Sequence, residues 1–256
     1  GISPAVEGEE MHVNIPGFKG GDRETIELPS IQSRLLAELK KAGKKIVLVN
    51  FSGSAIALTP ETKTCDAILQ AWYPGQAGGT AIANVLFGDY NPAGRLPVTF
   101  YKSTNQLPDF EDYSMKERTY RYMTEAPLFP FGHGLSYTTF QYGNASLNTP
   151  EIKDGEQVTL TIPVSNTGKY DGEEVVQVYL RRPGDKEGPS HALRAFKRVA
   201  IAKGTTNQVT IPLSKENFEW FDTGTNTMRP IEGEYEILYG GTSELKQLKS
   251  IPVTIK

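Results

Sequence analysis

The sequence predicts an α/β layer, a parallel sheet with flanking helices, followed by an all-β sandwich. Between residues 31 and 100, segments of helical periodicity alternate with short apolar runs, which is typical of strand–helix–strand units in a parallel sheet. After Tyr137, short segments with a period of two residues are separated by turn clusters, as in a β-sandwich. A chain of 256 residues can bury two such cores, so we expect two domains.

The stretch from Trp72 to Phe100 organises the first layer, and it reads WYPGQAGGTAIANVLFGDYNPAGRLPVTF. A strand over Ala67–Trp72 is expected to run into a tight turn at Pro74-Gly75. A helix over about Gln76–Phe87 follows, because apolar residues recur there at helical spacing. Its apolar face would consist of Ala81, Ile82, Val85 and Leu86.

The end of this helix is followed by a second strand. Gly88 stands where a helix ends in a left-handed residue, and Asn91–Gly94 is a turn sequence. The apolar residues after that turn predict a short strand over Leu96–Phe100.

An earlier helix and strand complete the α/β pattern. Pro29-Ser30 opens a helix, Lys40 and Lys41 suit its last turn, and Gly43 closes it. One apolar face is expected, formed by Ile31, Leu35, Leu36 and Leu39. The unbroken run KIVLVN, residues 45–50, predicts a strand buried on both faces.

The loop Tyr73–Gln76 is expected at the edge of a ligand site, because ligands bind outside the carboxyl ends of parallel strands. We interpret Gly78 and Gly79 as residues that allow close packing of the helix on the sheet, rather than as ligand contacts. Neither a P-loop nor a GxGxxG motif is present, so no nucleotide cofactor is predicted.

The second half predicts about seven strands, the number in a small β-sandwich. Trp220 and Tyr235 are its expected core aromatics, and nothing in this half has catalytic spacing. The strands are expected over Phe140–Leu147, Gln157–Val164, Glu174–Arg181, Leu193–Ala202, Gln208–Leu213, Gly233–Leu238 and Ser250–Ile255.

Between the two halves, residues 105–134 lose periodicity and are rich in aromatics. Such a strip can line a sugar site, but we interpret it as a tether packed along a domain seam. The aromatic residues are Phe110, Tyr113, Tyr120, Tyr122, Phe129 and Phe131.

Charge and length exclude several function classes. The formal net charge is −3 with scattered basic residues, so no nucleic acid partner is predicted. No apolar run approaches the roughly 18 residues that span a bilayer, so no membrane insertion is predicted. Cys65 is the only cysteine, which excludes an internal disulfide, and we interpret it as a small buried residue.

The three histidines and Cys65 have no spacing that would bind a metal, so no metal site is expected. His133 lies between two glycines, and we interpret it as a turn residue held by backbone hydrogen bonds at the domain junction. His12 could face a substrate, and His191 is expected at the surface.

Three blocks of the sequence together resemble the C-terminal portion of glycoside hydrolase family 3, which includes β-glucosidases and β-xylosidases. The first block is the stretch from Trp72 to Phe100 described above. The others are FPFGHGLSYTTF, residues 129–140, and VSNTGKYDGEEVVQVYLRRP, residues 164–183, in the order in which the family has them. The resemblance covers nearly the whole chain.

The resemblance implies a partial α/β sandwich domain over residues 1–110, a linker over 111–139 and a fibronectin type III-like domain over 140–256. Family members carry a (β/α)8 barrel before these domains, and an Asp of that barrel is the nucleophile. The chain starts at Gly1 with neither an initiator Met nor a signal peptide, so we expect further residues upstream. No residue of this chain can take the nucleophile role, and we expect no turnover from the chain by itself.

The general acid/base of the family is a Glu in a variable loop before a Gly-Asp-Arg-like element. The corresponding loop here is VEGEEMHVNIPGFKGGDR, residues 6–23. By composition alone, its cluster of carboxylates is expected to be solvated. The pattern of related xylosidases places Glu9 on the acid/base position. Glu10 stands where a Gly is usual and an insert precedes Asp22-Arg23, so Glu10 and Glu7 remain alternatives.

The chemistry of a retaining glycosidase requires two carboxyl groups about 5 to 5.5 Å apart, one a nucleophile and one a proton donor. The donor must be protonated at neutral pH, so burial or a like charge has to raise its pKa. The cluster of Glu7, Glu9 and Glu10 would supply the like charge.

The expected function is therefore the C-terminal part of a periplasmic or secreted bacterial exo-β-glycosidase, with β-xylosidase first and β-glucosidase second. Its expected partners are an oligosaccharide or aryl glycoside substrate and the barrel of the same protein. A non-catalytic carbohydrate-binding or protein-interaction module is the alternative. A nucleotide-binding α/β protein is a third interpretation, and it would require ATP to shift the melting temperature.

Overall fold

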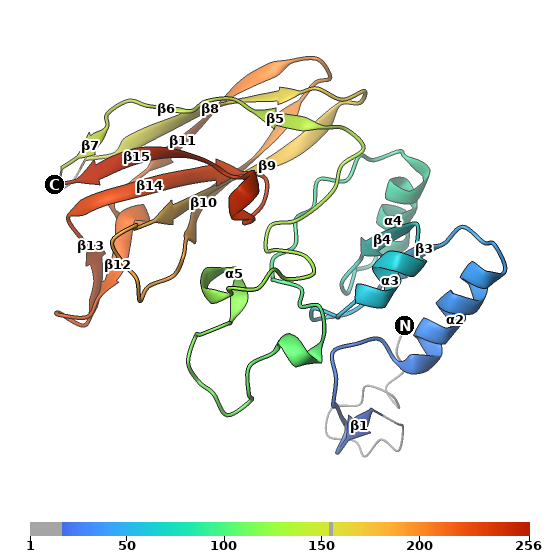
Figure 1. The fold of residues 1–256 in the computed structure, drawn as a ribbon. Helices are drawn as coiled ribbons and strands as arrows, with labels where there is room; N and C mark the ends of the chain where they lie inside the picture. The colour runs from blue at the N-terminus through green and yellow to red at the C-terminus, as the bar shows by residue number, and fades with distance from the viewer. Residues whose placement is uncertain (1–16, 154–155) are drawn as a thin grey trace. The chain divides into compact units, whose positions relative to one another are not determined.

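The computed structural model describes residues 17–153 and 156–256, which fall into two compact units (Figure 1). The described part of the first unit comprises residues 17–86, 99–117 and 125–129. The second unit comprises residues 87–98, 118–124 and 130–256, apart from the two positions not described. No helix among the described residues is long and apolar enough to cross a membrane.

The first unit has a parallel two-stranded sheet with helices, as the alternating pattern predicts. Strands β3 and β4 pair in parallel, with Val47 opposite Ala67 and Asn50 opposite Gln70. The order of elements is β1 (Phe18–Lys19), β2 (Asp22–Arg23), α2 (Ser30–Lys41), β3 (Val47–Asn50), α3 (Thr59–Thr64), β4 (Ala67–Gln70) and α4 (Gly78–Phe87), with a 3-10 turn over Thr104–Gln106.

Burial in this unit is smaller than the sequence predicts. In α2 only Leu36 of the expected apolar face is buried, whereas Ile31, Leu35 and Leu39 are exposed. Strand β3 is also open on one side, because Val47 is exposed. A sheet of two strands covers only part of an apolar stripe, so the prediction of a strand buried on both faces is wrong for the described chain.

Helix α4 begins at Gly78, two residues later than predicted. On its expected apolar face Ile82 and Val85 are half-buried, while Ala81 and Leu86 are exposed. Gly88 follows the helix with a φ of 86°, which confirms the expected left-handed residue.

The predicted strand over Leu96–Phe100 does not form. Instead, its two ends bond separately to a later segment. In the second unit, the Leu96 N–H donates to the His133 carbonyl over 2.9 Å, and the Gly132 N–H donates to the Leu96 carbonyl over 2.8 Å. In the first unit, Phe100 forms an isolated bridge with Phe129. The strand was predicted from the apolar residues of a run of only five. Pro97 lies in this run and has no N–H to donate, which disfavours a continuous ladder between the two ends.

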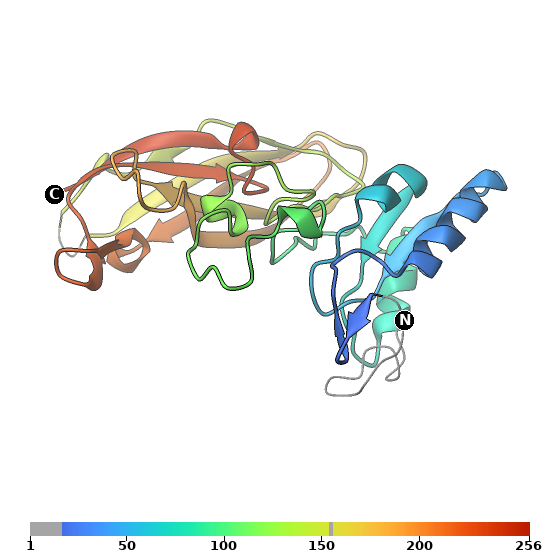
Figure 2. The ribbon, with the colours of Figure 1, turned by 60° about the horizontal axis from the view of Figure 1, so that its bottom comes forward.

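The second unit is a β-sandwich of two main sheets, visible from two directions in Figures 1 and 2. One sheet has the order β10-β9-β14-β15-β7, and the other has the order β11-β8-β5 with β6 also paired to β8. The bounds are β5 (Phe140–Tyr142), β6 (Ser146–Leu147), β7 (Glu151–Ile152), β8 (Val158–Asn166), β9 (Gly172–Arg181), β10 (Ala192–Ile201), β11 (Thr206–Leu213), β14 (Gly233–Gly240) and β15 (Lys249–Ile255).

Three features of this unit lie outside the sandwich pattern that the sequence predicts. A hairpin pairs β12 (Glu219–Asp222) with β13 (Thr227–Pro230), and α5 is one helical turn over Thr119–Tyr122. Short 3-10 turns occupy Lys215–Phe218 and Leu245–Gln247.

The core of the second unit lies between its two sheets. In β8 every second residue from Val158 is buried, so one face of the strand points into the core. Trp220 and Tyr235 are buried in this core, which confirms the prediction for both. The Trp220 indole N–H donates to the Asp185 carboxylate over 2.6 Å, so its one polar atom is satisfied.

Candidate functional site

The carboxylates proposed for acid/base chemistry, Glu7, Glu9 and Glu10, lie outside the described residues, as does His12. The structure therefore describes the chain from the hairpin that directly follows their loop. Two surfaces of the first unit bear on the predicted site: this hairpin, and the carboxyl ends of β3 and β4.

The hairpin β1–β2 is formed by the sequence GFKGGDR. Gly20 and Gly21 connect its strands with φ values of 63° and 101°, which glycine adopts without strain. Its base is closed by the Glu24 N–H, which donates to the Gly17 carbonyl over 2.8 Å. The Gly-Asp-Arg element thus comprises the second glycine of the turn and the strand β2 that follows it.

Arg23 and Glu27 attach this hairpin to the rest of the unit. The Arg23 guanidinium donates to the Glu27 carbonyl. The Glu27 carboxylate in turn accepts the Thr104 backbone N–H at 2.8 Å and the Thr104 hydroxyl at 2.7 Å. Burial raises the pKa of Glu27, but the hydrogen bonds that its carboxylate accepts, first of all from Thr104, together outweigh burial, so the net pKa is lowered and the group stays charged.

A polar cluster lies at the carboxyl ends of the parallel strands, with Asn50 and Ser52 buried and Gln70 half-buried. The Asn50 amide donates to the Gln70 side-chain oxygen over 2.7 Å and to the Ser52 hydroxyl over 3.1 Å. Gln70 closes the triangle by donating to the same hydroxyl over 3.1 Å. Sequence reasoning did not single out these residues. Their signal was a polar side chain at the end of each apolar strand, VLVN and AILQ.

A cavity of about 200 Å³ lies beside this cluster. Arg23 from the hairpin, Gln32 from α2, and Asn50 and Ser52 after β3 give it polar groups, and apolar residues such as Leu36 line the remainder. The polar lining holds both hydrogen-bond donors and acceptors, which is what a hydroxylated ligand requires. The loop of Glu7, Glu9 and Glu10 joins the hairpin that supplies Arg23, so the cavity is the best described candidate for a substrate-facing surface.

The loop after β4 has a fixed backbone. Trp72 has a φ of 57°, and its ring packs edge-on against Phe100 with 6.1 Å between centroids. Gly78 is close-packed, because a side chain there would collide with Pro74. Its close neighbour is therefore the loop after β4, and not the sheet as predicted. A side chain at Gly79 would meet open space, so the packing interpretation of Gly79 is wrong.

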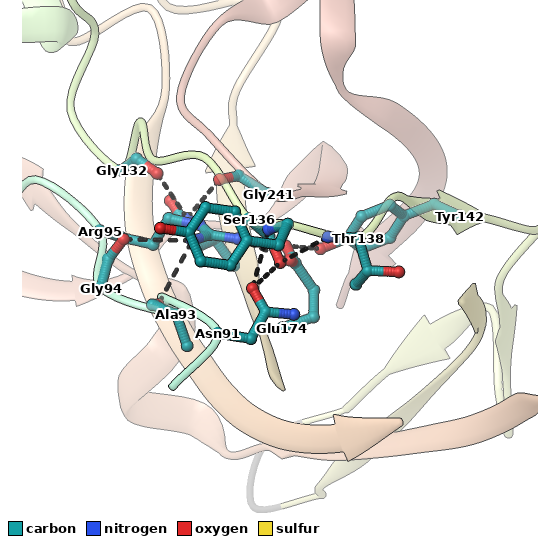
Figure 3. A network of polar contacts seen from close by, with 12 residues as sticks. Asn91, Ala93, Gly94, Arg95, Gly132, Ser136, Thr138, Tyr142, Glu174 and Gly241 are labelled. Atoms are coloured by element: carbon teal, nitrogen blue, oxygen red, sulfur yellow. Dashed lines mark hydrogen bonds and ion pairs between the residues drawn. The ribbon is translucent and has the colours of Figure 1, made fainter. Parts of the chain in front are cut away.

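In the second unit, a buried polar network connects Arg95, in the first of the three blocks quoted above, with Glu174, in the third (Figure 3). Arg95 pairs with Glu174 over 2.6 Å, with side chains that are 10% and 3% exposed. The other Glu174 oxygen accepts the Tyr142 hydroxyl at 2.8 Å, and Arg95 also donates to the Gly94 carbonyl over 3.1 Å. Burial raises the pKa of Glu174, while the charge of Arg95 opposes that rise. This network joins the segment after α4 to strand β9.

Further bonds fix the segment FPFGHGLSYTTF on the sandwich. The Gln177 amide donates to the Gly132 carbonyl over 3.1 Å and to the Gly241 carbonyl over 2.7 Å. Gly132 has a φ of 77°, and a side chain there would collide with Gln177. The His133 N–H donates to the Pro130 carbonyl over 3.1 Å, as expected of a turn residue. These residues hold the backbone in place. Among the described residues, no group of three or more His, Cys, Asp or Glu side chains is placed to hold a metal ion.

His191 is buried, with 2% of its surface exposed, so its prediction as a surface residue is wrong. One ring nitrogen lies 2.8 Å from the Ser190 hydroxyl and the other 2.9 Å from the Ser243 carbonyl. The ring packs edge-on against Tyr120 and Tyr179. Strand β10 begins directly after it, in the sequence GPSHAL.

The aromatic strip between residues 105 and 134 divides into packed and exposed members. Phe129 packs edge-on against Phe100 in the first unit. In the second unit Tyr120 stacks on Phe131 at 4.9 Å between centroids. Phe110 and Tyr113 are exposed. Cys65 is half-buried and unpaired, with a pKa raised by burial and by Glu61 and Asp66.

Comparison with known proteins agrees with this architecture. The sequence model of the glycosyl hydrolase family 3 C-terminal domain matches residues 1–137, and that of the fibronectin type III-like domain matches residues 174–243. A xylan 1,4-beta-xylosidase from Xylanibacter ruminicola is 58% identical over 255 residues, which are 100% of this chain and 29% of that protein. A periplasmic beta-glucosidase from Salmonella typhimurium is 34% identical over 91% of this chain and 34% of its own length.

Among solved structures, a β-glucosidase from Erythrobacter marinus superposes with a TM-score of 0.80 and 35% identity, covering 92% of this chain and 31% of that one. The chain thus spans about a third of the length of the relatives it matches. Both domain models match in the order in which the structure has the α/β unit and the β-sandwich, and the identity extends over the whole chain. The chain therefore belongs to glycosyl hydrolase family 3 and corresponds to the C-terminal portion of its members.

Proposed function

We propose that the longer protein is a retaining exo-β-glycosidase that removes terminal xylose from β-linked oligosaccharides, with glucose as the second candidate sugar. The observation that carries this proposal is the 58% identity to a xylan 1,4-beta-xylosidase along the whole chain. The relatives extend well beyond the region that matches this chain, so the activity belongs to the longer protein and this chain supplies part of its site.

Glu9 is the proposed general acid/base, with Glu10 and Glu7 as alternatives. In the first step its carboxyl proton passes to the departing glycosidic oxygen while the barrel nucleophile attacks the anomeric carbon. In the second step the Glu9 carboxylate accepts a proton from the water that releases the sugar. Like charge from Glu7 and Glu10 would raise the pKa of Glu9 and keep it protonated at neutral pH.

The cavity of the first unit supports a sugar site in the domain that carries this loop. The acidic loop leads directly into the hairpin that carries Arg23, and Arg23 lines the cavity next to Asn50 and Ser52. Hydroxyl, amide and guanidinium groups are suited to the hydroxyl groups of a sugar. The domain boundaries at residues 110 and 140 remain a prediction.

A leaving-group comparison in the full-length protein tests the role of Glu9. The substitution Glu9→Gln removes the transferable proton and keeps the size of the side chain. We expect the rate on xylobiose to fall about 10²- to 10⁴-fold, the usual contribution of a positioned general acid. Formation of the glycosyl intermediate from an aryl xyloside with a good leaving group should be much less affected, because that leaving group departs without protonation. Pre-steady-state kinetics would measure both steps.

Glu7→Gln and Glu10→Gln are matched controls from the same loop. Each should change the pH profile of hydrolysis, by removing like charge, without reproducing the dependence on leaving group. Unchanged activity of Glu9→Gln on both substrates would exclude Glu9 from the mechanism. The same dependence in Glu10→Gln or Glu7→Gln would transfer the role to that residue.

A non-catalytic carbohydrate-binding module is the second candidate. The observation that favours it is the fibronectin type III-like half, which lies outside the proposed catalytic loop. Absence of hydrolysis by the full-length protein on aryl xylosides and aryl glucosides would select this candidate. We propose a periplasmic or secreted location, supported by the Salmonella typhimurium relative, which is named as periplasmic.

A further inference from the structure

Two large aromatic side chains stand almost fully exposed on one loop of the first unit. Phe110 is 92% exposed and Tyr113 is 91% exposed, higher fractions than those of the other exposed large apolar residues in the described chain. Met115 on the same loop is also exposed. Exposed single apolar residues are common, but two rings three residues apart on one loop, each with nearly all of its surface in water, indicate a contact site.

The backbone that carries these rings is fixed by local hydrogen bonds. The Asp109 carboxylate accepts the Glu111 N–H at 2.8 Å, and the Asp112 carboxylate accepts the Ser114 N–H at 2.8 Å. The Asp112 N–H also donates to the Asp109 carbonyl over 3.1 Å. Phe110 directly follows Asp109, and Tyr113 directly follows Asp112. Both rings are therefore presented from a loop that these hydrogen bonds order. A preordered loop loses little conformational entropy when it binds.

The chemical surroundings of the rings distinguish between classes of partner. Asp109, Glu111 and Asp112 surround them in the sequence PDFEDY. Protein interface cores are depleted of Asp and Glu, and nucleic acids are polyanions, so both partners fit this loop poorly. A neutral sugar fits both features, since its axial C–H face packs on an aromatic ring and its hydroxyl groups donate to carboxylates.

We propose that Phe110 and Tyr113 form a saccharide-stacking surface that binds neutral β-linked pyranose units of an oligosaccharide or polysaccharide. This inference rests on the proposed function for the kind of sugar, β-xylan or β-glucan. It adds a contact to the chain of the polymer, distinct from the cavity at the carboxyl ends of β3 and β4.

The test measures binding of the full-length protein to soluble xylan and to soluble β-glucan by affinity electrophoresis. The variant is Phe110→Ala/Tyr113→Ala. The matched control is Phe196→Ala/Tyr170→Ala, which removes one Phe and one Tyr that are 68% and 60% exposed on the second unit. Replacing both loop residues by Trp keeps a stacking face and provides a rescue variant.

We expect the dissociation constant for one of the polymers to rise about threefold to tenfold for each ring removed, as stacking contacts typically contribute. The control and the Trp variant should bind as the unaltered protein does. Equal binding by the alanine variant and the unaltered protein would overturn the proposal. So would a fall in melting temperature with unchanged polymer binding, because the rings would then pack against protein.

A kinetic comparison separates this proposal from the proposed function. If the full-length protein hydrolyses aryl xylosides, the ratio of kcat/KM for xylohexaose to that for the aryl xyloside should fall in the alanine variant. If the alanine variant and the unaltered protein bind the polymers equally and hydrolysis is normal, the stacking surface is refuted and the enzymatic proposal is not. Polymer binding that depends on the two rings, in a protein that hydrolyses no glycoside, would refute the enzymatic proposal and support the stacking surface.

Discussion

His191 shows at the scale of one residue how burial determines protonation. Desolvation lowers its pKa to about 4. The hydrogen bond with Ser243 opposes this shift in part, and the positive charges of Arg181 and Arg121 add to it. The ring is therefore neutral in the folded protein at neutral pH. The rings of Tyr120 and Tyr179 pack edge-on against it and keep water away from the imidazole.

The lowered pKa of His191 predicts a loss of stability in acid. The unfolded chain binds this proton near pH 6.5 and the folded protein only near pH 4, so the folded state is favoured above pH 6.5 and loses that advantage as the pH falls between these values. The free energy of unfolding should decrease by about 3 kcal/mol across this range. Urea unfolding at several pH values would measure it.

The variant His191→Gln serves as the comparison, because glutamine does not titrate. Its free energy of unfolding should depend less steeply on pH between 4 and 6.5 than that of the unaltered protein. His133, whose pKa burial and Arg95 also lower, contributes in the same direction in both proteins and cancels in the difference. Equal slopes in the two proteins would show that His191 titrates normally.

At the scale of elements, the pair Arg95–Glu174 joins the segment after α4 to strand β9. Removing one member leaves a buried charge unpaired, which typically costs about 3–5 kcal/mol. We expect this loss from Arg95→Met, and a partial recovery in Arg95→Met/Glu174→Leu. The fluorescence of Trp220 during urea unfolding, in a Trp72→Phe background, reports on the second unit because the chain has two tryptophans.

The exposed pair Arg198–Glu173 in the same unit is the matched control. Its side chains are 51% and 34% exposed, so Arg198→Met should cost less than about 1 kcal/mol. Similar costs for Arg95→Met and Arg198→Met would mean that the buried pair does not secure this segment.

The elements also show which parts of the fold the sequence could predict. Strands β8 and β11 were predicted because one side of each faces the core, so buried and less buried residues alternate along β8 and the second half of β11. Hairpin β12–β13 was missed because its strands show no clear alternation of apolar and polar residues. Its large apolar residues Phe221 and Met228 are exposed, so they do not mark a face toward the core. The polar cluster of Asn50, Ser52 and Gln70 was missed because each residue is unremarkable alone and only the register of β3 and β4 brings them together.

At the scale of the whole molecule, two units with different physical roles stand in one chain. The second unit is a sandwich with a continuous apolar core and buried polar bonds that hold its connecting segments. The first unit has a small sheet, an exposed apolar helix face and a polar cavity at its strand ends. The described polar cavity thus lies in the first unit, and the continuous apolar core lies in the second.

The central proposal is that this chain supplies the general acid/base of a retaining glycosidase through Glu9. Chemical rescue of Glu9→Ala in the full-length protein tests it most directly. An aryl xyloside with a good leaving group still forms the covalent intermediate, but water then attacks slowly because no carboxylate accepts its proton. Azide requires no such base. We predict that added azide restores turnover and that the product is β-xylosyl azide. An α-xylosyl azide product, or no rescue with activity otherwise intact, would contradict the assignment.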